Sequence, residues 1–270
     1  MQNDKAYAVK SYSPEEKKEY ALQKKKERDE IYSFLNRETL ALKDDPEKLR
    51  DFFRVQARFN NYTISNAILI LSQDKDATSI KDFFDWASRE VRINRGAKAI
   101  KLLYQRTYET KEGDIRYTYS VKSMFDISET SRKNYIVTPD RKGPEELIEL
   151  LYSSSPVPRR EHENEDAVME AYTLANEVAL KDLQVNEYQK DDMFNVALLS
   201  SIMVLGRYGT EPDKELLEKV MEVLGDMDER CIRKILSTSK DTSNRIIERM
   251  DHEIYRKMVR ENRREAAAER

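Results

Sequence analysis

A basic segment between residues 86 and 106 is the part of this sequence whose residue types and spacing could most readily do chemistry. It holds 6 basic residues and 1 acidic residue, and Gly96 lies in its middle. A glycine lets the backbone turn tightly and approach a ligand without a side chain in the way. Spaced cations of this kind can neutralise the phosphates of a nucleic acid. The candidate phosphate-binding residues are Arg89, Arg92, Arg95, Lys98, Lys101 and Arg106.

Tyrosines follow this segment on a predicted β-hairpin. Residues 99–108 and 115–122 alternate in polarity, and Glu112-Gly113 supplies a turn between them. Along each strand the tyrosines lie two or four residues apart, so each strand's pair shares one face. Exposed bases of single-stranded nucleic acid stack on such rings for about 1–3 kcal/mol each, whereas a duplex keeps its bases stacked inside. The candidate stacking residues are Trp86, Tyr104, Tyr117 and Tyr119, with Tyr108 on the same hairpin.

Both features also have an ordinary structural interpretation. A row of tyrosines on a hairpin is often half-buried sheet packing, and spaced arginines near a helix end often form a solvated face. Residue spacing alone therefore leaves nucleic-acid binding and plain packing both open.

The elements that must position these residues are mostly helical. Only 6 glycines and 7 prolines interrupt 270 residues, and Ser13-Pro14 is typical of a helix start. Short strands are expected at 124–127 and 135–137 beside the hairpin. The expected helices cover 14–58 with a new start at Pro46, then 65–72, 80–89, 144–152, 162–184, 190–207, 212–224, 228–239 and 243–267.

This pattern predicts an α+β fold in which N-terminal helices pack on a small antiparallel sheet and an all-α region follows. We expect a binding domain at 1–140, a short helix and linker at 141–160, where SSSPVPRR is the linker, and a helical domain at 161–270. A single cysteine excludes a disulfide scaffold. The N-terminus lacks an apolar targeting segment, and no apolar run reaches the length of a membrane span, so we expect a soluble, cytoplasmic protein without membrane contact.

Three stretches in order resemble the N-terminal single-stranded-DNA-binding domain of the ArdC antirestriction family, over roughly residues 30–140. They are YTISNAILILSQDKDATSIKDFFDWA, VRINRGAKAIKLL and MFDISET. The matching positions are Tyr62, Asn66, Leu69, Ile70, Gln73, Trp86, Val91, Gly96, Lys98, Ile100, Phe125, Asp126, Ser128 and Thr130, with Glu129 where glutamine is usual. The resemblance implies single-stranded-DNA binding on a mobile genetic element, in an antirestriction or conjugation role. It adds Tyr62 and Asn66 to the candidate binding residues.

The departure from that family lies in the C-terminal half. Full-length members carry a metallopeptidase domain with H-E-x-x-H, in which two histidines on one helical face hold zinc and the glutamate activates a water. This sequence has 2 histidines, and its nearest string is His162-Glu163-Asn164-Glu165-Asp166. Aspartate can ligate zinc, but the string is better explained as an acidic helix start. We therefore expect no enzymatic activity, no metal and no cofactor, with a degenerate metallopeptidase as an alternative.

Charge is distributed unevenly along a chain whose net charge is −3. Residues 141–230 hold 10 basic and 21 acidic residues. An alternative hypothesis is therefore an interaction or inhibitor module whose acidic helices mimic nucleic acid toward a protein partner. Acids gathered on one exposed face would favour mimicry, and acids paired with lysine and arginine would count against it. In the main hypothesis, these C-terminal helices recruit a protein partner or form a homodimer.

Overall fold

Three capped helices open the part of the chain that the computed structural model describes, which comprises residues 13–110, 112–133, 141–160, 166–188 and 191–268. α1 (Pro14–Leu40) begins with a capping box in which Ser13 and Glu16 exchange hydrogen bonds with each other's backbone N–H groups. α2 (Pro46–Arg58) begins at Asp45, and α3 (Ile64–Gln73) begins at Thr63. Each cap satisfies N–H groups that have no partner within the helix.

The antiparallel sheet has the strand order β1-β3-β2 in the described residues. β2 (Ile100–Glu109) and β3 (Ile115–Asp126) form the predicted hairpin, and the short β1 (Ile80–Lys81) pairs with the end of β3. The predicted helix at 80–89 is wrong in its first turn, because Asp82 caps a shorter helix, α4 (Phe83–Ser88). A single 3-10 turn at Ile127–Glu129 follows β3.

The C-terminal half is helical, as predicted. It contains α5 (Pro144–Ser154), α6 (Ala167–Val185), α7 (Met193–Arg207), α8 (Lys214–Leu224) and α9 (Glu229–Ala268). Together with the sheet, these helices confirm the α+β class. The expected strand at 135–137 and the expected first turn of the helix at 162–184 lie outside the described residues.

The predicted break between 239 and 243 is wrong, because α9 runs through it as one helix of 40 residues. The hydroxyl of Ser239 donates to the carbonyl of Ile235, and that of Ser243 donates to the carbonyl of Lys240. Ser200 of α7 donates to the Ser239 carbonyl at 3.1 Å. These polar residues therefore face the α7 contact with their hydrogen bonds satisfied inside or beside the helix. They do not mark a loop.

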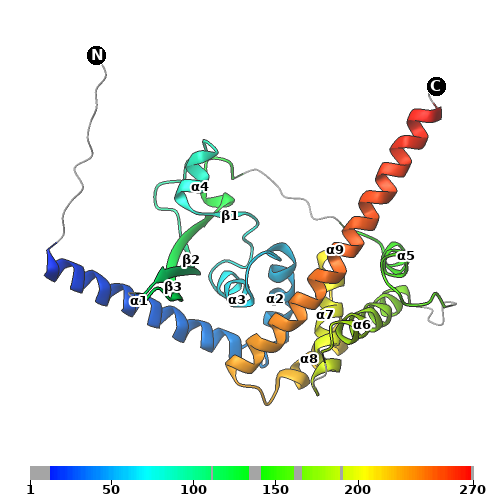
Figure 1. The fold of residues 1–270 in the computed structure, drawn as a ribbon, viewed down its shortest axis with the longest axis horizontal. Coiled ribbons are helices and arrows are strands. Elements are labelled where there is room, and N and C mark those ends of the chain that lie inside the picture. Colours follow the sequence, from blue (N-terminus) through cyan, green and yellow to red (C-terminus); the bar gives the residue numbers. More distant parts are fainter. Residues whose placement is uncertain (1–12, 111, 134–140, 161–165, 189–190, 269–270) are drawn as a thin grey trace.

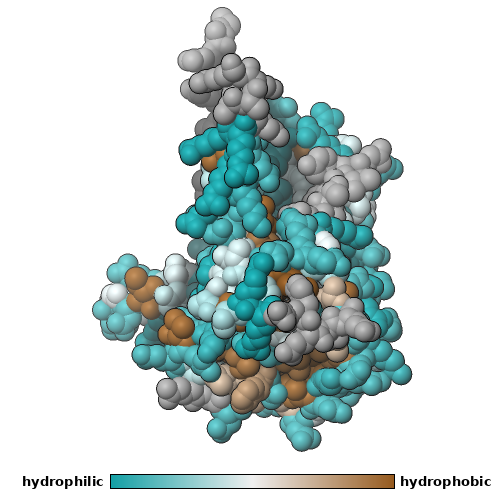
Figure 2. All heavy atoms as spheres, turned by 90° about the vertical axis from the view of Figure 1, so that its right-hand side faces the viewer, coloured by the Kyte–Doolittle hydropathy of each residue, from teal (hydrophilic) through white to brown (hydrophobic). Residues whose placement is uncertain are grey.

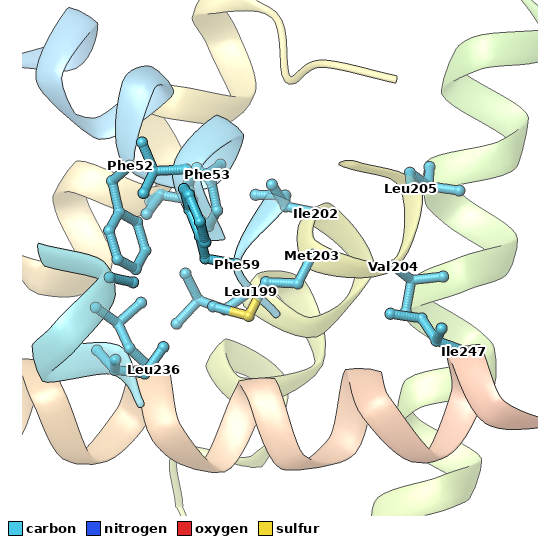
Figure 3. Packing of buried hydrophobic residues seen from close by; sticks show 14 of the residues in the cluster. Phe52, Phe53, Phe59, Leu199, Ile202, Met203, Val204, Leu205, Leu236 and Ile247 are labelled. Atoms are coloured by element: carbon cyan, nitrogen blue, oxygen red, sulfur yellow. The ribbon is translucent and has the colours of Figure 1, made fainter. Parts of the chain in front are cut away.

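One cluster of buried apolar side chains includes residues from α1, α2, α3 and β2 and from all five C-terminal helices. Figure 3 shows Phe52, Phe53 and Phe59 of the α2 region pointing toward Met203 of α7, with Leu236 of α9 below them. The domain division at residue 140 stays a prediction. None of the helices in the described ranges combines the length and apolarity needed to cross a membrane.

The C-terminal part of α9 projects beyond the other helices, away from the sheet (Figure 1). Seen from the side of α9, hydrophilic side chains dominate the surface, and apolar atoms form separate groups in its lower part (Figure 2).

Candidate nucleic-acid interface

The loop between α4 and β2 carries most of the predicted cations. It is anchored on the segment after β3: Ile93 bridges to Thr130, Asn94 N–H donates to the Glu129 carbonyl at 2.9 Å, and the Arg92 carbonyl accepts from Ser131 N–H at 2.8 Å. Gly96 has φ +82°, which side-chain-bearing residues rarely adopt. The loop is therefore a fixed turn, held by backbone hydrogen bonds.

Four cations on this turn are exposed and form no ion pair within the described ranges. We name them the cation turn: Arg89, Arg92, Arg95 and Lys98. Lys101 differs, because its ammonium lies 3.2 Å from the carboxylate of Glu27 on α1. Lys24 pairs with the same carboxylate at 2.8 Å, and the two lysines lower the pKa of Glu27. Lys101 is thus a weaker candidate for phosphate binding than the cation turn.

The register of the hairpin separates the predicted tyrosines onto two faces. Tyr104 pairs with Ser120 and Tyr108 with Arg116, whereas Tyr117 and Tyr119 pair with Thr107 and Gln105. Because directly paired residues share a face and neighbours alternate, Tyr104 and Tyr108 lie on one face and Tyr117 and Tyr119 on the other. The hairpin therefore does not offer one continuous platform of four rings.

The face with Tyr104 and Tyr108 is basic and open. We name it the basic face: Tyr104, Arg106, Tyr108, Arg116 and Lys122. Tyr104 and Tyr108 are 53% and 49% exposed. None of the β2 and β3 residues that pair with each other on this face is acidic. The arrangement places a guanidinium between two rings along β2.

Lys122 of the basic face is held by a ring and by a carboxylate. Its ammonium lies 4.8 Å from the centre of the Tyr104 ring and forms an ion pair with Asp82 at the start of α4. The hydrogen bond with Asp82 raises the pKa of Lys122, and the same bond lowers the pKa of Asp82. Beside Asp82, the exposed rings of Phe83 and Phe84 meet edge-on at 5.6 Å. Phe83 and Phe84 lie in the segment predicted as the helix at 80–89, and nothing in the residue pattern indicated that their rings would be exposed.

The opposite face lies against α1. On this face Lys101 reaches Glu27, and Leu103 is buried in the core. Burial raises the pKa of Tyr32 on α1, and the nearby Tyr119 raises it further. Tyr119 therefore lies beside α1, whereas Tyr117 on the same face is 65% exposed.

Asn66 and Gln73 of α3 close the free edge of β2. The Asn66 side-chain amide donates to the Leu103 carbonyl at 3.0 Å and accepts from Leu103 N–H at 2.9 Å. Gln73 does the same with Lys101, at 3.0 and 2.9 Å. Two amide side chains two helical turns apart thus replace a neighbouring strand. Asn66 is 8% exposed, which corrects the expectation that it faces a ligand.

Replacing Asn66 with alanine should lower the free energy of unfolding by about 1–3 kcal/mol, because the Leu103 N–H and carbonyl would lose their partners in a buried place. Denaturant unfolding followed by circular dichroism would measure this change. Ser123→Ala, an exposed change on β3, is the control and should stay within about 0.5 kcal/mol. An Asn66→Ala protein as stable as this control would contradict the edge-closing role.

Trp86 is a second correction, since it is 3% exposed and has no open ring face for stacking. Its indole N–H donates to the Phe125 carbonyl at 2.9 Å, and it packs in a small cluster with Val91 and Ile127. Tyr62 is half-buried, and its hydroxyl lies 3.4 Å from the Ile80 carbonyl. Both residues hold the sheet in place.

Asp126 explains another part of the motif pattern. Its carboxylate accepts the N–H groups of Thr78 and Ser79, each at 2.8 Å, and that of Ser128 at 2.9 Å. Burial alone would raise the pKa of Asp126, but these backbone hydrogen bonds outweigh it and hold the pKa below its usual range. Asp126 thereby ties the segment before β1 to the end of β3.

Of the 18 acidic residues that the structure describes between 141 and 230, seven form the ion pairs given below and three cap helix starts. Ion pairs hold Glu146, Glu149, Glu177, Asp182, Glu211, Glu215 and Glu218. Asp166, Asp213 and Asp228 accept backbone N–H groups at helix starts. By the criterion set from the sequence, the seven ion-paired acids count against nucleic-acid mimicry.

Residues 162–165 of the histidine-containing string lie outside the described residues, so its zinc-binding potential stays untested. Elsewhere in the described ranges, no three histidine, cysteine, aspartate or glutamate side chains lie close enough to hold a metal ion.

No family model matches the sequence, and no curated protein matches it either. Among solved structures, the chain is similar to the Mn(II)-bound crystal structure of the antirestriction ArdC protein from the R388 plasmid. The similarity has 12% identity and a TM-score of 0.48, over 70% of this chain and 85% of that one. The metal-free structure of the same protein gives 11% identity and a TM-score of 0.45, over 71% and 86%.

Proposed function

We propose that this protein binds single-stranded DNA without enzymatic activity, through the cation turn and the basic face. The observation that carries the proposal is a combination of two features. The exposed cations of the cation turn form no ion pair within the described ranges, and half-exposed rings lie on a hairpin face whose paired β2 and β3 residues include no acid. Nucleic acid is the ligand that uses both groups, because it combines a phosphate backbone with flat bases.

The spacing on β2 suits an unstacked strand. Tyr104 and Tyr108 are four residues apart, which is about 14 Å along a β-strand, with Arg106 between them. Two separated bases could stack on the rings while the guanidinium holds a phosphate between them. A duplex offers its phosphates but not its base faces, so preference for single strands is the expected selectivity.

Titration of labelled single-stranded and double-stranded oligonucleotides across salt concentrations tests the proposal. Single strands should bind more tightly. The combined change Arg92→Ala, Arg95→Ala, Lys98→Ala should reduce the slope of log affinity against log salt by about 2, because each lost phosphate contact on a single strand removes about 0.7.

A matched control removes the same charge elsewhere. Lys257, Arg260 and Arg263 are exposed on the part of α9 that projects away from the sheet, so their combined change to alanine should leave the slope nearly unchanged. Equal binding to both DNA forms, or equal loss of slope in both triple variants, would refute the proposed interface.

We further propose an antirestriction or conjugation role on a mobile element, which is what the resemblance of the sequence motifs implies. Protection of a single strand from nuclease digestion by the wild-type protein, but not by the cation-turn variant, would support a coating role.

A further inference from the structure

A cavity of about 850 Å³ lies on a different part of the molecule, between α2, the turn after α7 and α9. Cavities of this size accommodate small-molecule ligands such as nucleotides. It shares no residue with the cation turn or the basic face. A ligand bound there would therefore contact neither part of the interface described above.

Arginines dominate the charge of this cavity. We name the lining set the arginine cleft: Arg50, Arg54, Arg58, Arg141 and Arg207. Arg54 is engaged by Glu211, at 2.8 and 2.7 Å, and by Asp51, and Arg50 pairs with Glu47. Arg58, Arg141 and Arg207 form no ion pair in the described part of the chain, although nearby aspartates attract Arg58 and Glu211 attracts Arg141.

Five arginines and three carboxylates line the cleft, so its lining residues carry an excess of two positive charges. Glu211 is engaged by Arg54, and Asp251 accepts the hydroxyl of Tyr208 at 2.8 Å. Glu248 is exposed at the rim. Arg58 donates one hydrogen bond to the Lys75 carbonyl, and Arg207 lies 5.9 Å from the Tyr208 ring centre. The net positive charge of the lining residues therefore favours binding of an anion in the cleft.

Gly209 positions Arg141 at the cleft. Its φ is +90°, and a Cβ atom there would come within 2.9 Å of the Arg141 side chain. Only a residue without a side chain allows both the left-handed turn and the close passage of Arg141. The turn and the arginine are thus fitted to each other.

One polar atom in the cleft wall has no hydrogen-bond partner among the residues that the structure describes. Asn244 of α9 lines the cavity, and its side-chain oxygen is buried without a hydrogen bond. Such an atom is costly to leave unsatisfied, so a ligand that supplies a donor would gain from it. Arginine forks bind phosphate in a bidentate manner, and a nucleoside carries hydroxyl or amino donors.

We propose that the arginine cleft binds the phosphate of a nucleotide, held by Arg58, Arg141 and Arg207. The shared chemistry is a phosphomonoester attached to a nucleoside. Its source is either a free mononucleotide or the 5′-phosphorylated end of a DNA strand. The assignment is independent of the single-stranded-DNA interface.

Calorimetric titration of the full chain with deoxyadenosine monophosphate, deoxyadenosine and inorganic phosphate tests the cleft. The monophosphate should bind at least about tenfold more tightly than the nucleoside, because charged hydrogen bonds to phosphate contribute most. The double variant Arg141→Ala, Arg207→Ala should bind the monophosphate about tenfold or more weakly than the wild-type protein. The triple alanine variant of the cation turn should bind the monophosphate with the wild-type affinity.

The two sources are separated with one oligonucleotide carrying either a 5′-phosphate or a 5′-hydroxyl. A preference for the phosphate that survives in the cation-turn variant assigns the cleft to strand ends. If the two oligonucleotides bind equally well and the monophosphate also binds, the cleft is assigned to free nucleotides. Inorganic phosphate binding as tightly as the monophosphate overturns the nucleotide assignment, and absence of binding by all three small molecules overturns the site.

Folding controls keep this test decisive. Arg141 and Arg207 form no ion pair within the described residues, but they pack beside Gly209 and Tyr208, so the unfolding temperature of the double alanine variant is measured alongside its binding. Arg141→Lys keeps the charge but loses the planar fork, and it should also weaken the monophosphate. Full binding by both variants would overturn the proposal.

Discussion

Replacing Tyr104 and Tyr108 together with leucine is expected to weaken single-stranded-DNA binding by about 30-fold or more. Each ring lost from a base stack costs about 1–3 kcal/mol, and 2 kcal/mol corresponds to about 30-fold in affinity. Both rings are about half exposed on the basic face, so leucine should change the surface while the buried core stays intact. Fluorescence anisotropy with a labelled oligonucleotide at fixed salt would measure the change.

The matched control is the same change on the other face of the same hairpin. Tyr117 and Tyr119 are also exposed, at 65% and 42%, but they share their face with the α1 contact. Their replacement with leucine should change affinity by less than about threefold. Equal losses in both double variants would mean that the strand wraps both faces, and a larger loss at Tyr117 and Tyr119 would place the interface on the wrong face.

The distribution of these tyrosines over two faces shows what residue spacing can and cannot predict. The period of two predicted correctly that each strand's pair shares a face. Which pairs meet depends on the register, which here places Glu109 opposite Ile115. A slip of one residue would have put all four rings together. The turn type and loop length set the register of a hairpin, and the residue spacing along each strand does not reveal it.

The motif residues show a second limit of prediction from sequence: their spacing was recognised, but their structural role was not. Asn66, Gln73 and Asp126 are spaced as a binding motif would be, but each hydrogen-bonds to a backbone segment far away in the sequence. Asn66, for example, pairs with Leu103. Amide and carboxylate side chains can supply the hydrogen bonds that buried backbone N–H and C=O groups need when no strand or helix supplies them. The helices and hairpin were predictable from local pattern, whereas these long-range pairings were not.

Replacing Asp182 with alanine is expected to lower the free energy of unfolding by about 3–5 kcal/mol. Its carboxylate on α6 is 3% exposed and binds two arginines of α9, with Arg245 at 2.6 Å and Arg249 at 2.8 Å. Removing the anion leaves two partly buried guanidiniums without a counter-charge, and such losses are large. The unfolding temperature should fall by about 6–15 °C, measured by scanning calorimetry.

An exposed pair from the same acidic stretch supplies the control. Glu215 and Lys219 lie 2.9 Å apart on α8, with both side chains more than half exposed. Glu215→Ala should therefore change stability by less than about 0.5 kcal/mol. If Asp182→Ala cost no more than this control, the α6–α9 ion cluster would not stabilise the helical half.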